Sequence, residues 1–495
     1  MAEKKVVRYK LVKHKWPDEI KAERNRRMKR IAIVCVCILC FCSGFFLNQV
    51  TGTRAMGDDK QGAKKFSEIY SLMMNQFYFG KDQKNFEDKL ISGAIDGMVN
   101  AGEDIHTSYL DPKSTQSFTS SMEGSYVGIG IQFYAMDENT FIVSKVFQDS
   151  PAEKAEILPG DRIYAIEGKV CEGMTLDDVK DLITASEDEK IEIEVIREDK
   201  HLKKEVKLAT VLNTVISEMK GTTGILELST FAETSRDEVE NHLKDMKKKG
   251  AKNLVLDLRD NGGGYLKAVQ GIASLLLPDD TVIFKEQDKD GNIELYKTKK
   301  GSDTYTFDRI VVVVNGSTAS AAEVLTAALK EQLKASVVGT KTYGKGTVQV
   351  PLAFSDGSMF KYTIAEWLTP NGKHINGKGI TPDVEVTLEP ALTMGAPELK
   401  KDEVYKADTV NIAAESVQTY LKFLGYAVDR TDSYFSPASS EALKQYQKDK
   451  GLKVTGEINQ ESISSLLSSC AIKWHSNTEA YDYQMKKAVS MANGR

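Results

Sequence analysis

The stretch that most constrains the fold of this 495-residue chain runs from residue 310 to residue 349. It opens with five consecutive β-branched residues, Ile310 to Val314, and passes through a turn into a helical pattern that begins at Ala321. An unbroken apolar run of this kind is typical of a strand buried on both faces of a sheet. The stretch closes with Lys345, which has glycine on both sides, and Gln349. We therefore expect an α/β domain here, with Ser320 at the start of a helix.

Length and composition bound the rest of the molecule. A chain this long is too large for a single hydrophobic core, so about three domains are expected. The net charge of −5 gives no reason to expect nucleic acid as a partner. Four of the six cysteines lie in one apolar run near the N-terminus, and Cys171 and Cys470 are far apart in sequence. This arrangement indicates neither a disulfide framework nor a zinc site, and no cofactor is expected.

The N-terminus has the pattern of a membrane anchor. Residues 1–30 contain twelve Lys or Arg against four Asp or Glu, and residues 31–47 contain no charge. The run is at the short end of what spans a bilayer, and the basic segment before it should stay in the cytoplasm. A cleaved signal peptide is the alternative, but its basic region would be unusually long and no small-x-small cleavage site follows. We predict a cytoplasmic segment over 1–30, a single-pass cell-membrane anchor over 31–48 and an extracytoplasmic catalytic region.

Residues 61–120 carry apolar side chains at helical spacing, which predicts a helical N-terminal region. These helices could pack on their own domain or on a second subunit, so the pattern is compatible with a homodimer. The turn-rich segment 101–112 closes the region, and His106 within it is interpreted as a loop residue rather than a ligand. Nothing in this region indicates catalytic chemistry.

Between residues 121 and 210 the apolar period changes to two, which indicates strands. With a turn at Gly160-Asp161 and a helical pattern over 176–183, this segment resembles a PDZ domain. In such domains, backbone N–H groups of a glycine-containing loop bind the terminal carboxylate of a peptide, which then adds as a strand. The glycines could instead relieve a tight strand entry. The resemblance implies a peptide-binding loop made of Tyr126, Val127, Gly128, Ile129, Gly130 and Ile131.

Residues 211–396 alternate strands and helices, which predicts an α/β core. Within it, an apolar strand over 253–258 leads into Arg259-Asp260-Asn261-Gly262-Gly263-Gly264, and a helix follows. Glycines between a buried strand and a helix leave backbone N–H groups pointing outward, where they could stabilise developing negative charge. Phosphate-binding loops use similar turns, but this sequence lacks the Gly-Lys-Ser/Thr ending of a P-loop.

Ser320 and Lys345 each have an ordinary explanation when taken alone. Ser320 and Glu323 fit a capping box at the start of a helix, and a lysine between two glycines is often a surface residue. Together they suggest more, because a strand that starts at Lys345 places Gln349 on the same face, where its amide could hold the amine. A Ser-His-Asp triad is the enzymatic alternative, but its candidate, His374, lies in a glycine-rich turn and is interpreted as structural or exposed.

Three motifs resemble the carboxyl-terminal processing (tail-specific) serine proteases: Asp257–Gly264, Ser317–Glu323 and Gly344–Gln349. A PDZ-like module precedes them, as in that family. The family often has serine where Ala322 stands and proline where Gly262 stands, and neither departure affects the assignment. The resemblance implies a crotonase-like ββα core without a metal. It also implies Ser320 as nucleophile, Lys345 as general base, Gln349 as the residue that orients the lysine, and Gly264 and Ala321 as oxyanion-hole donors.

A charged linker over 397–408 leads into a second small domain at 409–470. Its apolar residues have helical spacing, and Leu424-Gly425-Tyr426, Tyr446-Gln447 and Gly451–Gly456 resemble the peptidoglycan-binding domain of bacterial wall enzymes. The resemblance implies a small all-α fold and peptidoglycan as a partner, although the same core could bind a protein or brace the enzyme. The tail, 471–495, is polar and carries no clear pattern.

These expectations combine into a multidomain α/β protein with a transmembrane helix, a helical N-terminal region, a β-rich PDZ domain, a protease core and an all-α C-terminal domain. The implied function is a membrane-anchored serine endopeptidase that cleaves extracytoplasmic proteins recognised through their C-termini. Burial would have to lower the pKa of Lys345 from its usual value of about 10.4 for the amine to act as a base. A non-enzymatic PDZ and wall-binding scaffold is the alternative, and the intact Ser320, Lys345 and Gln349 argue against it.

Overall fold

The computed structural model describes residues 60–137, 140–184, 190–197, 200–212, 214–301, 303–400 and 402–494. The predicted cytoplasmic segment and membrane anchor, residues 1–48, lie outside these ranges. Within them, no helix combines the length and the hydrophobicity needed to cross a bilayer. The chain divides into two compact units, residues 1–98 and 99–495.

The described part of the first unit is helical, as the spacing of its apolar residues predicted. It consists of α2 (Lys60–Gln76), the short 3-10 helix η1 (Gly80–Asp82) and α3, which begins at Phe86 and ends at Ala101. The rings of Phe77 and Phe86 stack with centroids 5.8 Å apart. Many of the large apolar side chains on these elements remain exposed, among them Phe66, Ile69, Leu72, Tyr78, Phe79 and Met98.

The second unit is built around a six-stranded sheet that carries the predicted catalytic stretch. Its strands, in spatial order, are β10 (Val215–Lys220), β11 (Thr223–Leu228), β12 (Asn253–Asp257), β15 (Arg309–Val314), β16 (Ser336–Gly339) and β19 (Val384–Glu385). β10 and β11 are antiparallel, whereas every other neighbouring pair is parallel. The β-branched run that opens the catalytic stretch is β15, and its last four residues are buried. The prediction of a doubly buried strand is therefore confirmed.

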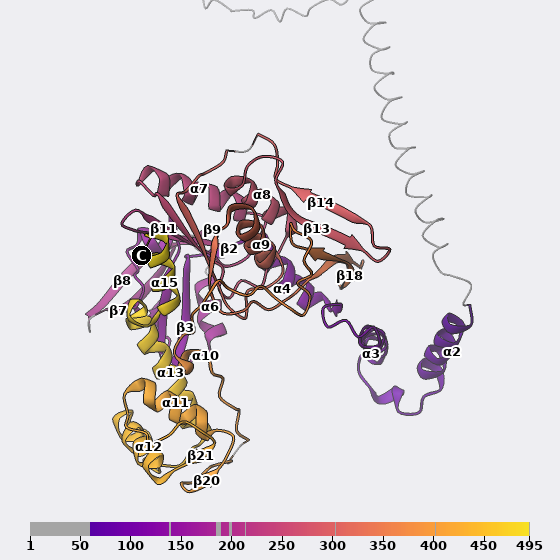
Figure 1. Ribbon diagram of the computed structural model, residues 1–495. Coiled ribbons are helices and arrows are strands. Elements are labelled where there is room, and N and C mark those ends of the chain that lie inside the picture. The colour runs from indigo at the N-terminus through magenta and orange to yellow at the C-terminus, as the bar shows by residue number, and fades with distance from the viewer. Residues whose placement is uncertain are drawn as a thin grey trace, which may run out of the picture. The chain divides into compact units, whose positions relative to one another are not determined.

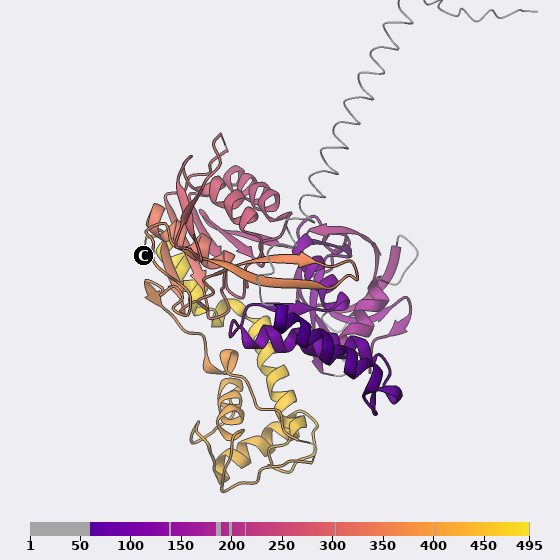
Figure 2. The ribbon, with the colours of Figure 1, turned by 90° about the vertical axis from the view of Figure 1, so that its right-hand side faces the viewer.

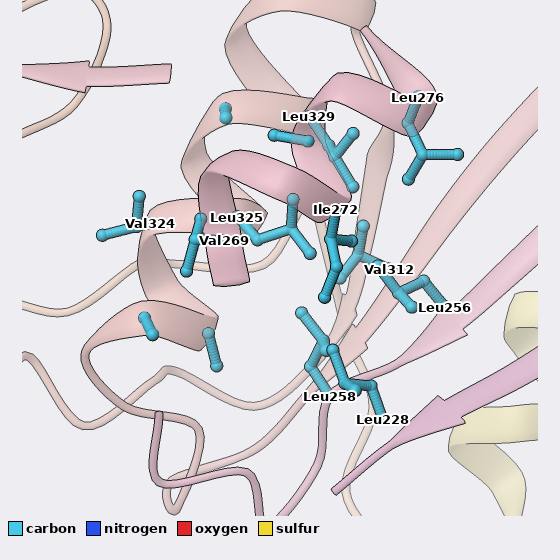
Figure 3. Close-up of a cluster of buried hydrophobic side chains, with 14 of the residues drawn as sticks. Leu228, Leu256, Leu258, Val269, Ile272, Leu276, Val312, Val324, Leu325 and Leu329 are labelled. Atoms are coloured by element: carbon cyan, nitrogen blue, oxygen red, sulfur yellow. The ribbon is translucent and has the colours of Figure 1, made fainter. Parts of the chain in front are cut away.

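Helices cover one face of this sheet. They are α7 (Ser235–Lys248), α8 (Leu266–Leu276) and α9 (Ala321–Leu333), which lie together in Figure 1. Figure 3 shows Leu256 and Val312 of the strands packed against Ile272 of α8. Leu325 and Leu329 of α9 belong to the same buried cluster. Because α9 begins directly after the turn that follows β15, this packing fixes the position of Ser320.

The other face of the sheet is covered from the far end of the chain. Val311 and Val313 alternate with the residues of the first face, and they pack against Ala488 and Ala492 of α15 (Tyr483–Ala492). The sequence pattern after Ala471 predicted no element here. In the structure, α14 (Thr478–Tyr481) and α15 occupy this tail.

A second sheet carries the strand that follows Lys345. It contains β1 (Ser108–Leu110), β18 (Met359–Leu368), β13 (Val282–Asp288) and β14 (Ile293–Lys297), with β17 (Thr347–Ala353) also paired to β18. β17 carries Gln349, and β1 follows the loop that contains His106. The sheet thus joins the start of the second unit to the predicted catalytic lysine.

The predicted PDZ domain is formed by a separate sheet. Its strands are β3 (Ile131–Asp137), β4 (Thr140–Val146), β5 (Arg162–Ile166), β7 (Lys190–Arg197) and β8 (Lys200–Lys207), with β6 (Lys169–Val170) paired to β5. Helices α5 (Pro151–Lys154) and α6 (Leu176–Thr184) accompany these strands. The strands β2 (Ser125–Gly128) and β9 (Ala209–Leu212) pair where the chain enters and leaves the domain. Arg197 forms an ion pair with the fully buried Asp161 of the predicted turn, which ties the last strand to that turn.

The C-terminal region is predominantly helical, as predicted, with one small strand pair in addition. Its elements are α10 (Pro390–Thr393), β20 (Thr409–Val410), α11 (Ala414–Leu424), β21 (Tyr434–Phe435), α12 (Pro437–Asp449) and α13 (Gln460–Ser476). Buried Tyr420, Phe435 and Tyr446 belong to its own hydrophobic core. In sequence, this region lies between β19 and α15. Both of these elements pack in the predicted protease core, so the two ends of the region are tied to that core (Figures 1 and 2).

Candidate active site

Ser320 lies in a strained turn between β15 and α9. Its backbone has φ 55° and ψ −118°, which places a non-glycine residue in a left-handed region that costs about 1–3 kcal/mol. Strained strand-to-helix turns of this kind hold the nucleophilic serine of other hydrolases outward from the sheet. The carboxylate of Glu323 accepts a 2.9 Å hydrogen bond from the Ser320 N–H, as the capping-box pattern predicted. A cap alone does not require the strained φ, so the local geometry favours the functional interpretation of this serine.

The carboxylate of Glu323 does more than cap its helix. The side chain is fully buried, and it also accepts hydrogen bonds from the Thr342 hydroxyl, from the Gly344 N–H at 2.8 Å and from the Lys345 N–H at 2.9 Å. One oxygen, Oε2, receives both the Ser320 and the Lys345 N–H groups. The two backbone nitrogens are each 2.9 Å from this oxygen, so they lie close together although they are 25 positions apart in the sequence. Burial raises the pKa of Glu323, and the four hydrogen bonds oppose that rise.

The amine of Lys345 is half-buried and directed by Gln349. Its Nζ donates a 3.0 Å hydrogen bond to Gln349 Oε1, so the two side chains meet as predicted. The predicted strand start at Lys345 is wrong, because β17 begins at Thr347 and Lys345 lies in the loop before it. Burial lowers the pKa of Lys345, the charge of Lys361 lowers it further, and Asp104 opposes these effects. No carboxylate forms an ion pair with this amine in the described parts of the chain. The neutral form of the lysine is thus favoured relative to a lysine in water.

Two further residues hold this arrangement in place, and neither was expected from the sequence. The backbone carbonyl of His106 accepts a hydrogen bond from Gln349 Nε2, which fixes the amide with its oxygen toward Lys345. The indole of buried Trp367 donates to the Lys345 carbonyl at 2.8 Å. The interpretation of His106 as a loop residue without a role in the site is therefore incomplete. A main-chain acceptor has no side-chain signature, so the sequence offers no signal for it.

The glycine loop after β12 lies directly against the Ser320 turn. The Ala319 N–H donates to the Asn261 carbonyl at 2.9 Å, and the Asn261 side chain accepts from the Gly263 N–H at 2.9 Å. A Cβ on Gly263 would come within 2.9 Å of Ser320 Cβ, and one on Gly264 within 2.3 Å of the Phe231 carbonyl oxygen. With φ values of 106° and 141°, both positions require glycine. The glycine loop can therefore approach Ser320 this closely only because Gly263 and Gly264 have no side chains.

The two predicted oxyanion donors remain available for hydrogen bonding. Neither the Gly264 N–H nor the Ala321 N–H has an acceptor among the residues that the structure describes. Ala321 is the first residue of α9, where backbone N–H groups have no partner within the helix. Both N–H groups are therefore free to donate, as the predicted role in an oxyanion hole requires.

The structure brings some predicted residues together and leaves others apart. It shows no hydrogen bond between the Ser320 hydroxyl and the Lys345 amine; Glu323 links only the backbone N–H groups of the two residues. His374, the candidate for a triad, is exposed and pairs with Glu366 at 3.1 Å. It makes no contact with Ser320 within the described ranges, so the geometry does not assemble a triad there.

The predicted peptide-binding loop spans the end of β2 and the start of β3. Tyr126, Val127 and Gly128 belong to β2, Ile129 is buried, and Ile131 begins β3. A Cβ on Gly130 would lie 2.2 Å from Ser150 Cβ, and its φ is 85°. This glycine is thus required by packing within the domain.

Comparison with known proteins places this geometry in a family. The profile of peptidase family S41 matches residues 222–386, that of the PDZ domain residues 142–197, and that of a putative peptidoglycan binding domain residues 413–466. The carboxy-terminal processing protease CtpA of Bacillus subtilis (strain 168) is 32% identical over 461 residues, covering 92% of this chain and 96% of that protein. The chain belongs to peptidase family S41.

Other relatives of this S41 protease agree. A probable CtpA-like serine protease of Staphylococcus aureus (strain N315) is 33% identical over 421 residues, covering 84% of this chain and 83% of that protein. The solved structure of a photosystem II D1 C-terminal processing protease is 29% identical and covers 60% of this chain and 81% of its own, with a TM-score of 0.37. The S41 profile and the Bacillus subtilis and Staphylococcus aureus relatives confirm the resemblance seen in the sequence motifs, and the protein is a serine-type protease.

Proposed function

We propose that this S41 protease cleaves peptide bonds through a Ser320–Lys345 dyad. The observation that supports it most is the buried Glu323 carboxylate, which ties the backbone of the serine to the backbone of the lysine. The half-buried amine, paired with a neutral amide and with its pKa lowered by burial, fits the role of a general base.

The proposed reaction has two halves. Ser320 Oγ attacks the carbonyl carbon of the scissile bond while its proton passes to the neutral Lys345 Nζ, and the new oxyanion accepts hydrogen bonds from the Gly264 and Ala321 N–H groups. The C–N bond breaks as the ammonium of Lys345 returns the proton to the leaving amine. A water molecule gives a proton to the same lysine and attacks the acyl carbon. The ester C–O bond then breaks as the Lys345 ammonium returns the proton to Ser320 Oγ, which releases the new carboxylic acid and free Ser320.

We also propose that the substrates are extracytoplasmic proteins selected by their C-termini. The PDZ domain supports this, because such domains bind a terminal carboxylate and add the peptide as a strand. The basic and apolar segments at the N-terminus support a membrane anchor, and the C-terminal domain supports binding to peptidoglycan. The exposed apolar side chains of α2 and α3 support a homodimer in which a second copy covers them.

The dyad is tested by digestion of an unstructured protein with a free C-terminus. Wild type should cleave it, and Ser320→Ala and Lys345→Ala should each lose at least about a hundredfold in rate. Equal cleavage by all three proteins would remove the dyad. A substrate with an amidated C-terminus serves as the control for recognition, and its cleavage at the wild-type rate would remove the role assigned to the PDZ domain.

A further inference from the structure

The last turns of α13 leave the C-terminal domain and reach the PDZ domain. Ile463 and Leu466 of this helix are buried in the core of the C-terminal domain, whereas its end packs on β3 (Figure 1). There the imidazole of His475 stacks on the phenol ring of Tyr134, with centroids 4.7 Å apart and planes inclined by 26°. The C-terminal domain is therefore in direct contact with the edge strand of the PDZ sheet.

A groove of about 920 Å³ lies at this contact. Its volume falls within the range typical of ligand sites. The PDZ loop, β3, α6, the protease core and α13 each contribute to it. Its lining includes Ile129, Phe133, Ile183, Arg259, Ala471 and His475. The groove thus runs from the predicted peptide-binding loop to Arg259, which precedes the glycine loop after β12, and α13 forms part of its wall.

The position of α13 relative to a bound peptide follows from the sheet. β3 pairs only with β4 among the described strands, so its other edge can accept a peptide strand. A peptide that adds antiparallel to β3, with its carboxylate at the loop before Ile131, runs along β3 toward Asp137. Because Tyr134 is three positions beyond Ile131, the residue three places before the peptide's C-terminus lies beside Tyr134 and His475.

We propose that α13 forms the outer wall of the peptide groove, and that Tyr134 and His475 select an aromatic side chain three residues before the substrate's C-terminus. This inference rests on the proposed recognition of C-termini and names the part of the chain that reads the preceding residues. The C-terminal domain is then a component of substrate selection as well as a module for the cell wall.

The chemistry of the two rings favours an aromatic partner. Burial lowers the pKa of His475, and the charge of Lys145 lowers it further, which favours the neutral imidazole. Lys145 itself is paired with Glu227 of the core sheet. A neutral imidazole stacked on a phenol offers a flat apolar surface, on which a third ring packs in an offset or edge-to-face geometry.

The test measures peptide binding to the full-length protein with Ser320→Ala, which prevents cleavage. Two fluorescent peptides with free C-termini and an apolar last residue differ only in Phe or Ala three places before the end. The Phe peptide should bind about two- to tenfold more tightly, and His475→Ala should bring that ratio close to one. The matched control is His201→Ala, because His201 contacts Tyr164 elsewhere on the PDZ sheet, and it should leave the ratio unchanged.

A second variant and the possible outcomes keep the test decisive. Ala471→Gln adds bulk to the groove wall and should weaken the binding of both peptides. A wild-type preference for Phe that persists in His475→Ala would overturn the inference, as would equal binding of both peptides to the parent protein. Binding of neither peptide would overturn the proposed recognition of C-termini, and this inference with it.

Discussion

Replacing Glu323 with glutamine tests whether one carboxylate organises the active site. The carboxylate offers two acceptor oxygens to four donors, whereas an amide offers one oxygen and one NH₂ group. If the amide nitrogen takes the place of Oε2, it faces the N–H groups of Ser320 and Lys345. If it takes the place of Oε1, it faces the Gly344 N–H and the hydroxyl of Thr342.

The expected magnitude follows from the hydrogen bonds that an amide nitrogen cannot accept. In the first orientation, two hydrogen bonds to a charged group disappear in a buried site, at about 1.5–3 kcal/mol each. In the second, the Thr342 hydroxyl can accept from the amide, so only the hydrogen bond from the Gly344 N–H disappears. Because the amide adopts the less costly orientation, we expect Glu323→Gln to lower the free energy of unfolding by about 1.5–3 kcal/mol. The loops that carry the nucleophile and the base should separate, so kcat should fall at least about tenfold, with a smaller change in KM.

The assay combines chemical denaturation with peptide cleavage under conditions in which the variant is folded. Glu331→Gln is the matched control, because Glu331 lies on the same helix and accepts one backbone hydrogen bond, from Asn371, which an amide oxygen can retain. It should lose less than about 1 kcal/mol. A folded Glu323→Gln enzyme with kcat within twofold of wild type would refute the reasoning.

Four further predictions concern the base, the tail and the glycine loop. The value of kcat/KM should rise with pH through one ionisation below the usual lysine pKa. Lys361→Ala should move that ionisation to higher pH, because the charge of Lys361 lowers the pKa of Lys345. An unmoved pH profile in this variant would contradict the prediction. The pKa of Lys345 is lower in the folded state than in the unfolded state, so between these two pKa values the unfolded state binds more protons. The contribution of Lys345 to the free energy of unfolding should therefore increase with pH over this range. A Lys345→Met variant whose stability increases equally with pH in denaturation experiments would contradict this prediction. Asp482→Asn should lower the unfolding free energy by about 1–3 kcal/mol, because Asp482 pairs with buried Arg259 at 2.8 Å, and an unchanged denaturation midpoint would count against that contact. Gly264→Ala should abolish cleavage, since its Cβ would meet the Phe231 carbonyl, and a wild-type rate would show that the loop can move away.

The parts of the site that could be predicted are those encoded by neighbouring residues. The strand–turn–helix unit around Ser320 is visible because β15 is uniformly apolar and the helix follows at once. The pairing of Lys345 with Gln349 was predicted from a strand that starts at Lys345, and the two side chains meet although the strand begins two residues later, at Thr347. Both patterns depend on local backbone geometry, which the order of residues determines directly.

The parts that could not be predicted depend on contacts between distant segments. Glu323 matched a capping box, and nothing in that pattern shows that the same carboxylate also binds the backbone of Lys345. The backbone carbonyl of His106 accepts from Gln349, and any residue at position 106 would supply the same carbonyl, so its identity gives no signal. A strand buried on both faces did require a cover for its second face, but the pattern of β15 could not identify α15 as that cover.

The central claim is that neutral Lys345 takes the proton from Ser320, and Lys345→Arg tests it most directly. Arginine keeps much of the length, but it stays protonated and positively charged at any ordinary pH and so cannot accept a proton. Single-turnover cleavage of a peptide with a free C-terminus should therefore slow by about a hundred- to ten-thousandfold, with peptide binding nearly unchanged. A Lys345→Arg enzyme that cleaves at close to the wild-type rate would contradict the assignment of this lysine as the base.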